Sequence, residues 1–421
     1  MNIWIVNHYA IPPSMGGLVR HYYFSKYLQE KGHSVKIFTS SKIHNTDINM
    51  IQDGSLYKEQ VVDGIEYTFV RSKDYKGNGM DRIANMIDLP FKMWKTMKLF
   101  YRQEKPDAIY TSSPDLFVAF FALLFGKKNH IPVVMEVRDL WPESIVEYNS
   151  MSKRNPVIQV LYQLEKWMYK KADRIIFTME GGKDYIKDKK WDKVIDLNKV
   201  HHVNNGVDLK EFDFNAVHWT IEDSDLQNED KFKIVYVGSI RKANHVENLV
   251  EVAEALKEQG EENILFLIYG DGNEKEDLEL KCRNAGLDNI KFKGKVNKKY
   301  IPYILSKSNL NILNYKQANT WKYGGSQNKQ FEYLASGTPI CSNIKMGYSV
   351  IEKFACGVEE NIDTTKRYVE IVKSYKEMPE DLYELQCIRA RKASLYYDYE
   401  VLGSKIELIL MEVCEQSRGQ I

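Results

Sequence analysis

The sequence predicts an α/β protein made of two doubly wound parallel sheets in tandem. Short apolar runs of strand length alternate with segments in which apolar residues recur at helical spacing, as is typical of parallel sheets covered by helices. This alternation starts at the N-terminus and starts again near residue 233, after an acidic polar stretch at 209–230. A chain of 421 residues is also long for a single core. We therefore expect two domains, with residues 209–230 as the linker.

The N-terminal residues are predicted to form a βαβ unit. An apolar run at Ile3–Val6 suits a buried strand, a helix is expected over 18–31, and a second strand over 34–38. The loop after the first strand contains Gly16 and Gly17, which would let a ligand approach the backbone; a tight turn explains them equally well. The loop lacks the GxGxxG pattern, which argues against a nicotinamide cofactor.

A basic helix is predicted over residues 81–105. Its apolar residues, among them Ile83, Ile87 and Phe91, alternate with lysines and an arginine, and Pro90 interrupts it. Such a helix is either a membrane-surface element or a domain helix with its apolar side inward and a solvated basic face. The second interpretation is the more common one.

The remaining strands are expected where short apolar runs lie between helical segments. In the first domain they are Ala108–Thr111, Val133–Glu136, Arg174–Thr178 and Val200–Val203. In the second domain they are Lys233–Val237, Ile264–Tyr269, Ile290–Phe292, Leu310–Leu313 and Pro339–Cys341. After Pro379 the chain is expected to be largely helical to Gly419.

Composition indicates a folded soluble protein, with 43% hydrophobic and 28% charged residues. A net charge of +1 argues against a nucleic-acid partner, but residues 1–205 carry +7 and the remainder −6. The basic half suits peripheral contact with an anionic membrane, and solvated helix faces explain the same count. Five cysteines without metal-type spacing are typical of a reduced, cytoplasmic protein. We expect neither a signal peptide nor a membrane-spanning helix.

Residues 323–340 contain a candidate anion site. Gly324, Gly325 and Ser326 precede a helix expected to start near residue 328, and the amides that begin a helix are unpaired and carry its positive dipole end. Lys329 adds a charge at the first turn, and Glu332 offers two acceptor oxygens suited to a ribose. An ordinary capped helix is the alternative.

Six motifs in order extend this interpretation to the whole chain. They are the glycine pair at 16–17, EVRDLWPES at 136–144, NNGVD at 204–208, GSIRKAN at 238–244, YGDGN at 269–273 and the stretch at 323–340. Together they resemble the retaining glycosyltransferases of family 4, which have the GT-B fold of two Rossmann-like domains. The DLWPES and SQNKQFEYLASGTP patterns are most similar to bacterial transferases that build capsule, exopolysaccharide or O-antigen units.

The resemblance implies a role for each part of the chain. Residues 1–205 are expected to bind the acceptor and residues 206–393 the nucleotide-sugar, across a central cleft, with residues 394–421 crossing back to the N-terminal domain. The diphosphate is expected at Gly238 and Ser239 and at Lys329, and the ribose at Glu332. Which of Arg241 and Lys242 points inward stays open. The implied donor-binding residues are Gly16, Gly17, Gly238, Ser239, Arg241, Lys242, Gly270, Val296, Gly324, Gly325, Ser326, Lys329 and Glu332.

The sequence departs from the family pattern at two positions. Gly324 stands where the family usually has a glutamate near the donor sugar, and Arg138 stands where a histidine is expected. Asp139 is the candidate that orients or deprotonates the acceptor hydroxyl, with Arg138 on the diphosphate. A buried Arg138–Asp139 ion pair that fixes the loop is equally compatible with the sequence. The family implies retention without a protein nucleophile, so we assign none.

The resemblance also implies which ligands to expect. The donor is expected to be a UDP-sugar, which is the commonest donor of the family, and the sugar to be of hexosyl or N-acetylhexosaminyl type. The acceptor is a glycan or a polyprenyl-diphosphate-linked sugar. No metal or other cofactor is expected, because the only Asp-x-Asp motif, Asp223–Asp225, falls in the predicted linker. A sugar-nucleotide epimerase and a noncatalytic sugar-nucleotide binder are the alternatives.

Overall fold

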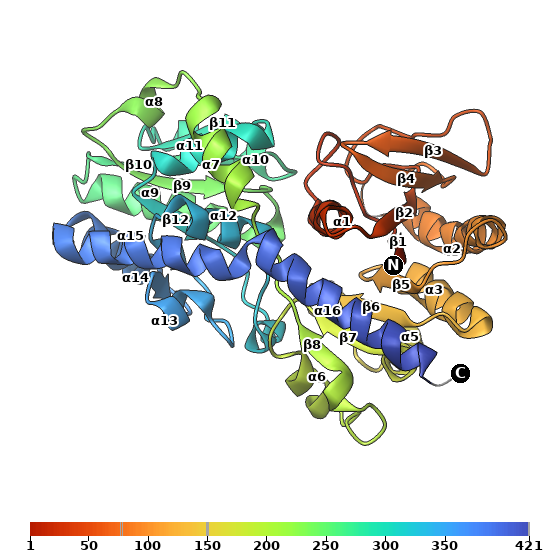
Figure 1. Ribbon diagram of the computed structural model, residues 1–421. Coiled ribbons are helices and arrows are strands. Elements are labelled where there is room, and N and C mark those ends of the chain that lie inside the picture. Colours follow the sequence, from red (N-terminus) through yellow and green to blue (C-terminus); the bar gives the residue numbers. More distant parts are fainter. Residues whose placement is uncertain (76, 78, 149–150, 420–421) are drawn as a thin grey trace. The chain divides into compact units, whose positions relative to one another are not determined.

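A computed structural model describes residues 1–75, 77, 79–148 and 151–419, and it divides the chain into two units (Figure 1). The N-terminal unit comprises Met1–Asn204 and Tyr399–Ile421, and the C-terminal unit comprises Asn205–Asp398. Each unit is one sheet covered by helices, so the predicted α/β fold with two doubly wound sheets is confirmed. Residues 394–398, predicted to belong to the returning segment, lie in the C-terminal unit, where the Tyr397 ring packs 4.9 Å from Phe331.

The N-terminal unit contains an eight-stranded sheet in the order β3-β4-β2-β1-β5-β6-β7-β8. All neighbouring strands are parallel except the β3–β4 pair. The strands are β1 (Asn2–Val6), β2 (Ser34–Ser40), β3 (Tyr57–Val62), β4 (Ile65–Val70), β5 (Ala108–Ser112), β6 (Val133–Val137), β7 (Arg174–Phe177) and β8 (Val200–His202). β1 lies between β2 and β5, so the strand order reverses at its carboxyl end, where ligands of such sheets usually bind.

Helices cover both faces of this sheet because successive side chains of a strand point to opposite faces. Ile3 and Ile5 belong to the core under α1 and α16, whereas Trp4 contacts Phe38 and, on α3, Phe125. The helical segments are α1 (Arg20–Glu30), α2 (Met80–Tyr101), α3 (Leu116–Asn129), α4 (Glu143–Tyr148), α5 (Pro156–Lys171), α6 (Gly182–Asp188), η1 (Leu197–Lys199) and α16 (Tyr399–Arg418).

The C-terminal helix α16 completes the core of the N-terminal unit. Leu402, Ile406 and Leu410 are almost fully buried in the core that contains Ile3 and Phe24. Each such side chain contributes about 1.5–3 kcal/mol when fully buried. The predicted return of the C-terminal segment to the N-terminal domain is therefore confirmed.

The C-terminal unit contains a six-stranded parallel sheet in the order β11-β10-β9-β12-β13-β14. The strands are β9 (Phe232–Val237), β10 (Ile264–Tyr269), β11 (Ile290–Gly294), β12 (Leu310–Leu313), β13 (Ile340–Ser342) and β14 (Gly357–Glu359). β9 lies between β10 and β12, which places the reversal of strand order of this unit at the carboxyl end of β9.

Two helical layers enclose this second sheet. Val235 and Leu267 belong to the core under α11, α12 and α15, and Ile234 and Phe266 belong to the core under α9 and α14. The helical segments are α7 (Leu209–His218), α8 (Ser224–Gln227), η2 (Lys242–Asn244), α9 (Glu247–Glu258), α10 (Lys275–Asn284), η3 (Lys298–Tyr300), α11 (Ile301–Ser306), η4 (Asn319–Tyr323), α12 (Asn328–Ser336), α13 (Val350–Phe354), α14 (Thr365–Lys376), α15 (Glu380–Ser394) and η5 (Leu395–Tyr397).

The prediction of a linker at 209–230 is wrong. The segment forms α7 and α8 within the C-terminal unit, and Leu209, Phe212 and Leu226 belong to its core. Within the segment, Asp223 caps α8 by accepting the amide of Asp225. Asp208, which directly precedes the segment, caps α7 by accepting the amide of Glu211.

The basic helix is α2, and its apolar residues do not all face inward as expected. Met86 and Met93 are buried, whereas Ile83, Ile87 and Phe91 are 47%, 52% and 62% exposed. Over the part of the chain that the structure describes, no helix has the length and apolarity needed to cross a bilayer.

Candidate functional site

Two glycine loops meet at the carboxyl ends of β9 and β10. Gly238 follows β9 and donates its amide to the carbonyl of Tyr269 at 2.9 Å. Gly270 follows β10, and a Cβ atom on it would lie 1.7 Å from the carbonyl oxygen of Gly238. This contact is backbone against backbone, so only glycine fits at position 270. The predicted residues Gly238 and Gly270 therefore lie together at the edge of the sheet where the strand order reverses.

Helix α12 is anchored directly to the end of β9. The hydroxyl of Tyr333, which is fully buried, accepts the amide of Val237 at 2.9 Å. This bond fixes the first turns of α12 beside the loop that starts with Gly238. The helix begins at Asn328 without a side-chain N-cap, so its start presents backbone amides that an anion can accept.

Lys329 on the first turn of α12 reaches into the space above Gly238. Its Nζ is buried, and within the described residues it has no hydrogen-bond partner. It lies 4.2 Å from the centroid of the Tyr236 ring and 5.0 Å from that of Tyr315. Burial lowers the pKa of Lys329 to about 7, and Glu332 opposes this shift. An ammonium buried without a partner is unstable by itself, so this position is suited to an anion that arrives from outside.

Glu332 lies one turn further along α12 and remains accessible. Its side chain is 15% exposed, and Oε1 lies 3.3 Å from Nζ of Lys298 in η3. The lysine is 46% exposed, so this ion pair is weak and a ligand can displace it. The carboxylate is thus available to accept two hydroxyl groups of a bound molecule.

The loop before α12 is held by the start of the C-terminal unit. Asn205 donates its amide to Oγ of Ser326 at 2.7 Å, and its side-chain amide donates to the Ser326 carbonyl. Gly324 has φ +90°, a conformation that favours glycine. A glutamate at 324 would therefore be strained, which gives a physical reason for the departure from the family pattern. Gly325 is packed against the Gln327 side chain, which would lie 2.5 Å from an added Cβ.

The remaining predicted donor residues lie on the surface around this site. Arg241 and Lys242 are both exposed, on the loop after β9 and in η2. The Ser239 hydroxyl donates to the Asn244 side chain at 3.1 Å. Val296 is half-buried and packs against the core under α12.

The two carboxylates of the Asp-x-Asp motif form ion pairs with lysines. Nζ of Lys293 lies 2.8 Å from Asp223 and 2.7 Å from Asp225, and Lys291 lies 2.8 Å from Asp225. Across the residues that the structure describes, no cluster of three or more histidine, cysteine or carboxylate side chains could hold a metal ion. The motif is therefore a structural salt-bridge cluster, and metal independence stays a prediction.

In the N-terminal unit, the predicted residues lie at the carboxyl edge of the sheet. Gly16 and Gly17 belong to the loop between β1 and α1, and neither has a positive φ. A Cβ on Gly16 would lie 3.1 Å from Ile11, whereas one on Gly17 would meet nothing within 4 Å. The space beside Gly17 is compatible with a ligand.

Arg138 and Asp139 follow β6 at the same edge. The amide of Arg138 donates to Oγ of Ser113 at 3.0 Å, and Asp139 is exposed. No ion pair joins the two side chains, as far as the described residues extend, so the buried Arg–Asp pair that the sequence left open is not formed. Asp139 is available to a substrate.

A buried network that we did not predict from the sequence lies beneath this edge. Nε of Arg20 donates to Glu136 at 2.6 Å, and its other nitrogens donate to the carbonyls of Val203 and Asn204. Burial alone would raise the pKa of Glu136, but Arg20 and His21 outweigh it and hold the pKa well below its usual range. The network ties α1 to β6 and so positions the loop that carries Asp139. Only the high polarity of EVRD, at the end of an apolar strand, hints at it.

A second pair that the sequence did not predict is His8 with Asp115. Nδ1 of His8, just after β1, lies 2.5 Å from Oδ2 of Asp115, which also caps α3. The His8 ring stacks on Tyr9 with 4.0 Å between centroids. Both residues are almost fully buried, so the pair links the ends of β1 and β5 from below the surface.

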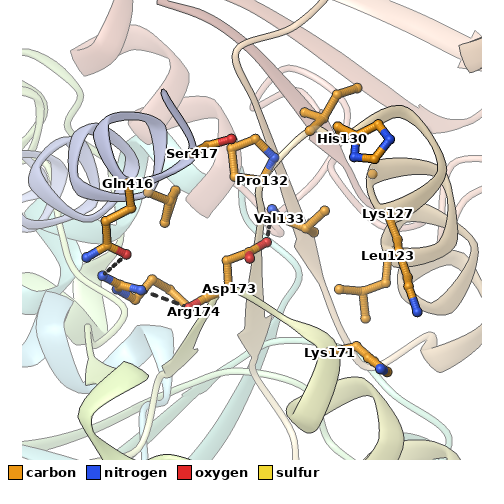
Figure 2. Close-up of a pocket in the computed structure, with 13 residues that line it drawn as sticks. Leu123, Lys127, His130, Pro132, Val133, Lys171, Asp173, Arg174, Gln416 and Ser417 are labelled. Atoms are coloured by element: carbon orange, nitrogen blue, oxygen red, sulfur yellow. Dashed lines mark hydrogen bonds between the residues drawn. The ribbon is translucent and has the colours of Figure 1, made fainter. Parts of the chain in front are cut away.

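A pocket of about 380 Å³ lies at the opposite, amino-terminal edge of the same sheet (Figure 2). It is lined by the starts of β6 and β7 and by the ends of α3, α5 and α16. Lys127 and Lys171 lie on the same side of it, and Arg174 donates to Gln416 (Figure 2). None of the predicted donor or acceptor residues lines this pocket, so it is separate from the candidate site.

Two sequence families match the chain, one for each half. Residues 15–211 match the family described as Glycosyltransferase Family 4, and residues 217–386 match Glycosyl transferases group 1. The two matches together span most of both units. No curated protein sequence matches the chain significantly.

Solved structures share the fold at low sequence identity. Sucrose-phosphate synthase from Thermosynechococcus elongatus aligns with a TM-score of 0.73 at 15% identity, covering 98% of this chain and 99% of that one. Anabaena HepE, solved in complex with UDP, aligns with 0.68 at 12%, covering 98% and 100%. WaaG, a glycosyltransferase involved in lipopolysaccharide biosynthesis, aligns with 0.63 at 12%, covering 97% and 99%. The likeness confirms the predicted GT-B fold.

Proposed function

Because both halves of the chain match glycosyltransferase families and the fold is GT-B, we propose that it transfers a sugar from a UDP-linked donor to a hydroxyl of a glycan or lipid-linked acceptor, with retention of anomeric configuration. The sugar is of hexosyl or N-acetylhexosaminyl type. The C-terminal unit binds the donor and the N-terminal unit binds the acceptor. The reaction belongs to bacterial surface polysaccharide biosynthesis, such as that of capsule or O-antigen.

The observation that carries the proposal is the buried ammonium of Lys329. In the described part of the chain Nζ has no hydrogen-bond partner and sits above the glycine that ends β9. A diphosphate supplies the missing negative charge, and the amides that begin α12 supply further donors. The departing nucleotide is more highly charged than the bound donor, so fixed positive charge here favours bond breaking.

Glu332 supports a nucleoside diphosphate over inorganic anions. Its carboxylate is one helical turn from Lys329 and is partly exposed, so it is placed to accept the ribose hydroxyls while Lys329 contacts phosphate. The choice of UDP is supported by HepE, whose structures contain UDP and UDP-glucose, and WaaG supports a role in surface polysaccharides.

The acceptor side of the proposal rests on Asp139. The residue is exposed at the carboxyl edge of the N-terminal sheet and has no ion pair with Arg138 within the described residues. In this proposal it orients the acceptor hydroxyl, and Arg138 assists the diphosphate. The departing phosphate accepts the hydroxyl proton, so the protein supplies no nucleophile. Lys329, with Arg241 and Lys242, provides the positive charge, and no metal ion is required.

A transfer assay tests the proposal. Purified protein is incubated with radiolabelled UDP-sugars, with GDP-sugars for comparison, and with a polyprenyl-diphosphate-linked sugar as acceptor. We expect the radiolabelled sugar to move from UDP-sugars, and not from GDP-sugars, to the lipid-linked acceptor. This transfer should continue when a metal chelator is present. Epimerised donor without transfer indicates the epimerase alternative, and binding without turnover indicates a noncatalytic binder. Either outcome overturns the proposal.

A Glu332→Ala variant checks the location of the site. We expect the affinity for UDP, measured by calorimetry, to fall about tenfold or more, since two hydrogen bonds to a charged group are lost. Lys298→Met is the matched control, because it removes the exposed lysine that pairs with Glu332 and keeps the carboxylate. Unchanged UDP affinity in the Glu332 variant means that the donor binds elsewhere.

A further inference from the structure

One outward stripe of α2 changes from apolar to basic along the helix. The exposed residues recur at helical spacing, and the first half of the stripe is apolar while the second half is positively charged. Met80 is 77% and Phe91 62% exposed. In order, the stripe consists of Met80, Ala84, Ile87, Phe91, Lys95, Lys98 and Arg102. A helix that only covers a sheet has no need of large apolar side chains on its outer side.

The apolar half of α2 continues across α3 to α5 through ring contacts. The Phe91 ring lies 4.9 Å from Phe121, Phe121 lies 5.8 Å from Phe120, and Phe120 lies 5.1 Å from Trp167 on α5. All four rings are partly or largely exposed. We call this row of rings, together with Ile87, the aromatic ridge. Val157 and Val160 extend the exposed apolar surface along α5, at 62% and 67% exposure.

Helix α3 explains why the ridge faces outward. Its sequence, LFVAFFALLFGKKN, is apolar around its whole circumference up to Gly126. Val118 and Ala122 face the core, and Phe117 and Leu124 remain half-exposed with the ridge. A helix that is apolar on all sides is expected to be covered on all sides, so this face lacks a partner.

Positive charge gathers at the end of the ridge. We define the basic cluster as Lys127 and Lys128, at the end of α3, and Lys170 and Lys171, at the end of α5; all four side chains are exposed. Nζ of Lys128 lies 5.8 Å from the ring of Trp94, which itself packs on Phe121 of the ridge. Lys127 lowers the pKa of Lys171, so these two charges lie close together.

Two acids near this surface have partners within the protein. Asp173, which lines the same pocket as Lys127 and Lys171, accepts the amide of Val133 at 2.7 Å, and Asp88 pairs with Lys92. Within the described residues the lysines of the basic cluster form no ion pair with an acid, so they can contact negative charge that comes from outside. Exposed phenylalanine and tryptophan beside lysine and arginine match the interfacial zone of an anionic bilayer, which is apolar below and negatively charged above.

We propose that the aromatic ridge and the basic cluster form one surface that docks on an anionic phospholipid bilayer. The rings of α2, α3 and α5 enter the interfacial zone, and the lysines contact lipid phosphates. The inference rests on the proposed function in that a lipid-linked acceptor lies in a membrane, but the surface itself is defined by exposure and charge alone.

Vesicle sedimentation in the absence of donor and acceptor tests the proposal. We expect the full chain to bind phosphatidylcholine–phosphatidylglycerol vesicles and to bind pure phosphatidylcholine vesicles weakly. Ile87→Ser/Phe91→Ser and Lys127→Glu/Lys171→Glu should each lower the binding constant by about tenfold or more, and added salt should weaken the binding. Because all four side chains are exposed, the variants should fold, and thermal melting checks this.

Matched controls lie on the C-terminal unit. Phe214→Ser/Val217→Ser removes two exposed apolar side chains from α7, and Lys366→Glu/Lys392→Glu reverses two exposed charges; both should bind vesicles like the wild type. The UDP affinity of the same variants is also measured in solution. Weaker vesicle binding with unchanged UDP affinity indicates a change in the docking surface alone, whereas weaker UDP binding indicates that the donor site is affected. Three results overturn the proposal: no vesicle binding by the wild type, equal loss in the control variants, or a dimer in solution that the ridge variant dissociates.

Discussion

The Nζ atom of Lys329 lies 2.7 Å from the place that a Cβ atom on Gly238 would occupy. Because Gly238 has no side chain, there is room at the end of β9 for the ammonium group of Lys329, which lies in the first turn of α12. The same virtual Cβ would lie 3.1 Å from the Tyr236 hydroxyl. Glycine, lysine and tyrosine thus share one small space, and a methyl group added there must displace the lysine.

Gly238→Ala should therefore weaken donor binding. Gly238 has φ +157°, a conformation that residues with a side chain rarely adopt, so we also expect the melting temperature to fall. We expect the affinity for UDP-glucose to fall about tenfold, the effect of losing one charge-assisted contact. Calorimetry and thermal melting measure the two quantities. Gly260→Ala, where φ is +74° and a Cβ meets nothing within 4 Å, is the matched control for backbone strain, and equal UDP-glucose affinity in both variants contradicts the prediction.

Donor binding should weaken as the pH rises. Burial lowers the pKa of Lys329 to about 7, so above that pH the unliganded protein has a neutral lysine and must take up a proton to bind a diphosphate. We expect the UDP-glucose association constant to fall by up to about tenfold per pH unit above pH 7. UDP-glucose is chosen because its diphosphate does not titrate in this range. Lys329→Met should bind weakly and without this slope; a slope that persists in the variant assigns the proton to another group.

Lys329→Met should also stabilise the unliganded C-terminal unit. The pKa of Lys329 is lowered from 10.5 to about 7 on folding, so the folded state disfavours the charged lysine that the unfolded state carries. The wild type therefore gains stability as the pH rises from about 7 to about 10.5, and the variant should be more stable at pH 7, by up to roughly 4 kcal/mol. Denaturant titrations at both ends of this range measure the difference, which should shrink at high pH. A variant that is less stable at pH 7 contradicts the buried-ammonium interpretation.

Asp139→Asn should separate catalysis from donor binding. The side chain is exposed in the N-terminal unit, so its replacement leaves the donor site of the C-terminal unit unchanged. We expect kcat to fall about a hundredfold, within the range of general acid–base effects, with UDP affinity unaltered. Glu180→Gln, an exposed acid elsewhere in the same unit, serves as control. Full activity of the Asp139 variant removes the residue from the proposed mechanism.

The fold was predictable because most of its strands are recognisable in the sequence as short apolar runs. β5 and β6 are buried along their whole length, so parallel strands appear as short uninterrupted apolar runs. The segment at 209–230 was misinterpreted because a run of acids resembles a linker until its partners are known: Asp223 caps a helix, and Asp225 pairs with two lysines. Composition does not distinguish a capping acid from a solvated one.

The site was predictable only in part. Lys329 and Glu332 belong to one helix, so their spacing already places them side by side. The pairs Arg20–Glu136 and His8–Asp115 join positions more than a hundred residues apart, and no local sequence pattern predicts such contacts. Helix α2 was ambiguous for another reason. It has apolar residues on both sides, and periodicity cannot say which side meets the sheet.

The N-terminal unit is discontinuous in sequence, and this sets an order of folding. Its core needs Leu402, Ile406 and Leu410, which the ribosome makes only after the whole C-terminal unit, Asn205–Asp398, has been synthesised. The N-terminal unit is therefore started first but completed last, and until then the side chains of Ile3 and Phe24 are not covered by α16. Synthesis that stops before Tyr399 leaves one finished unit attached to one that exposes its core, a species that chaperones and proteases recognise.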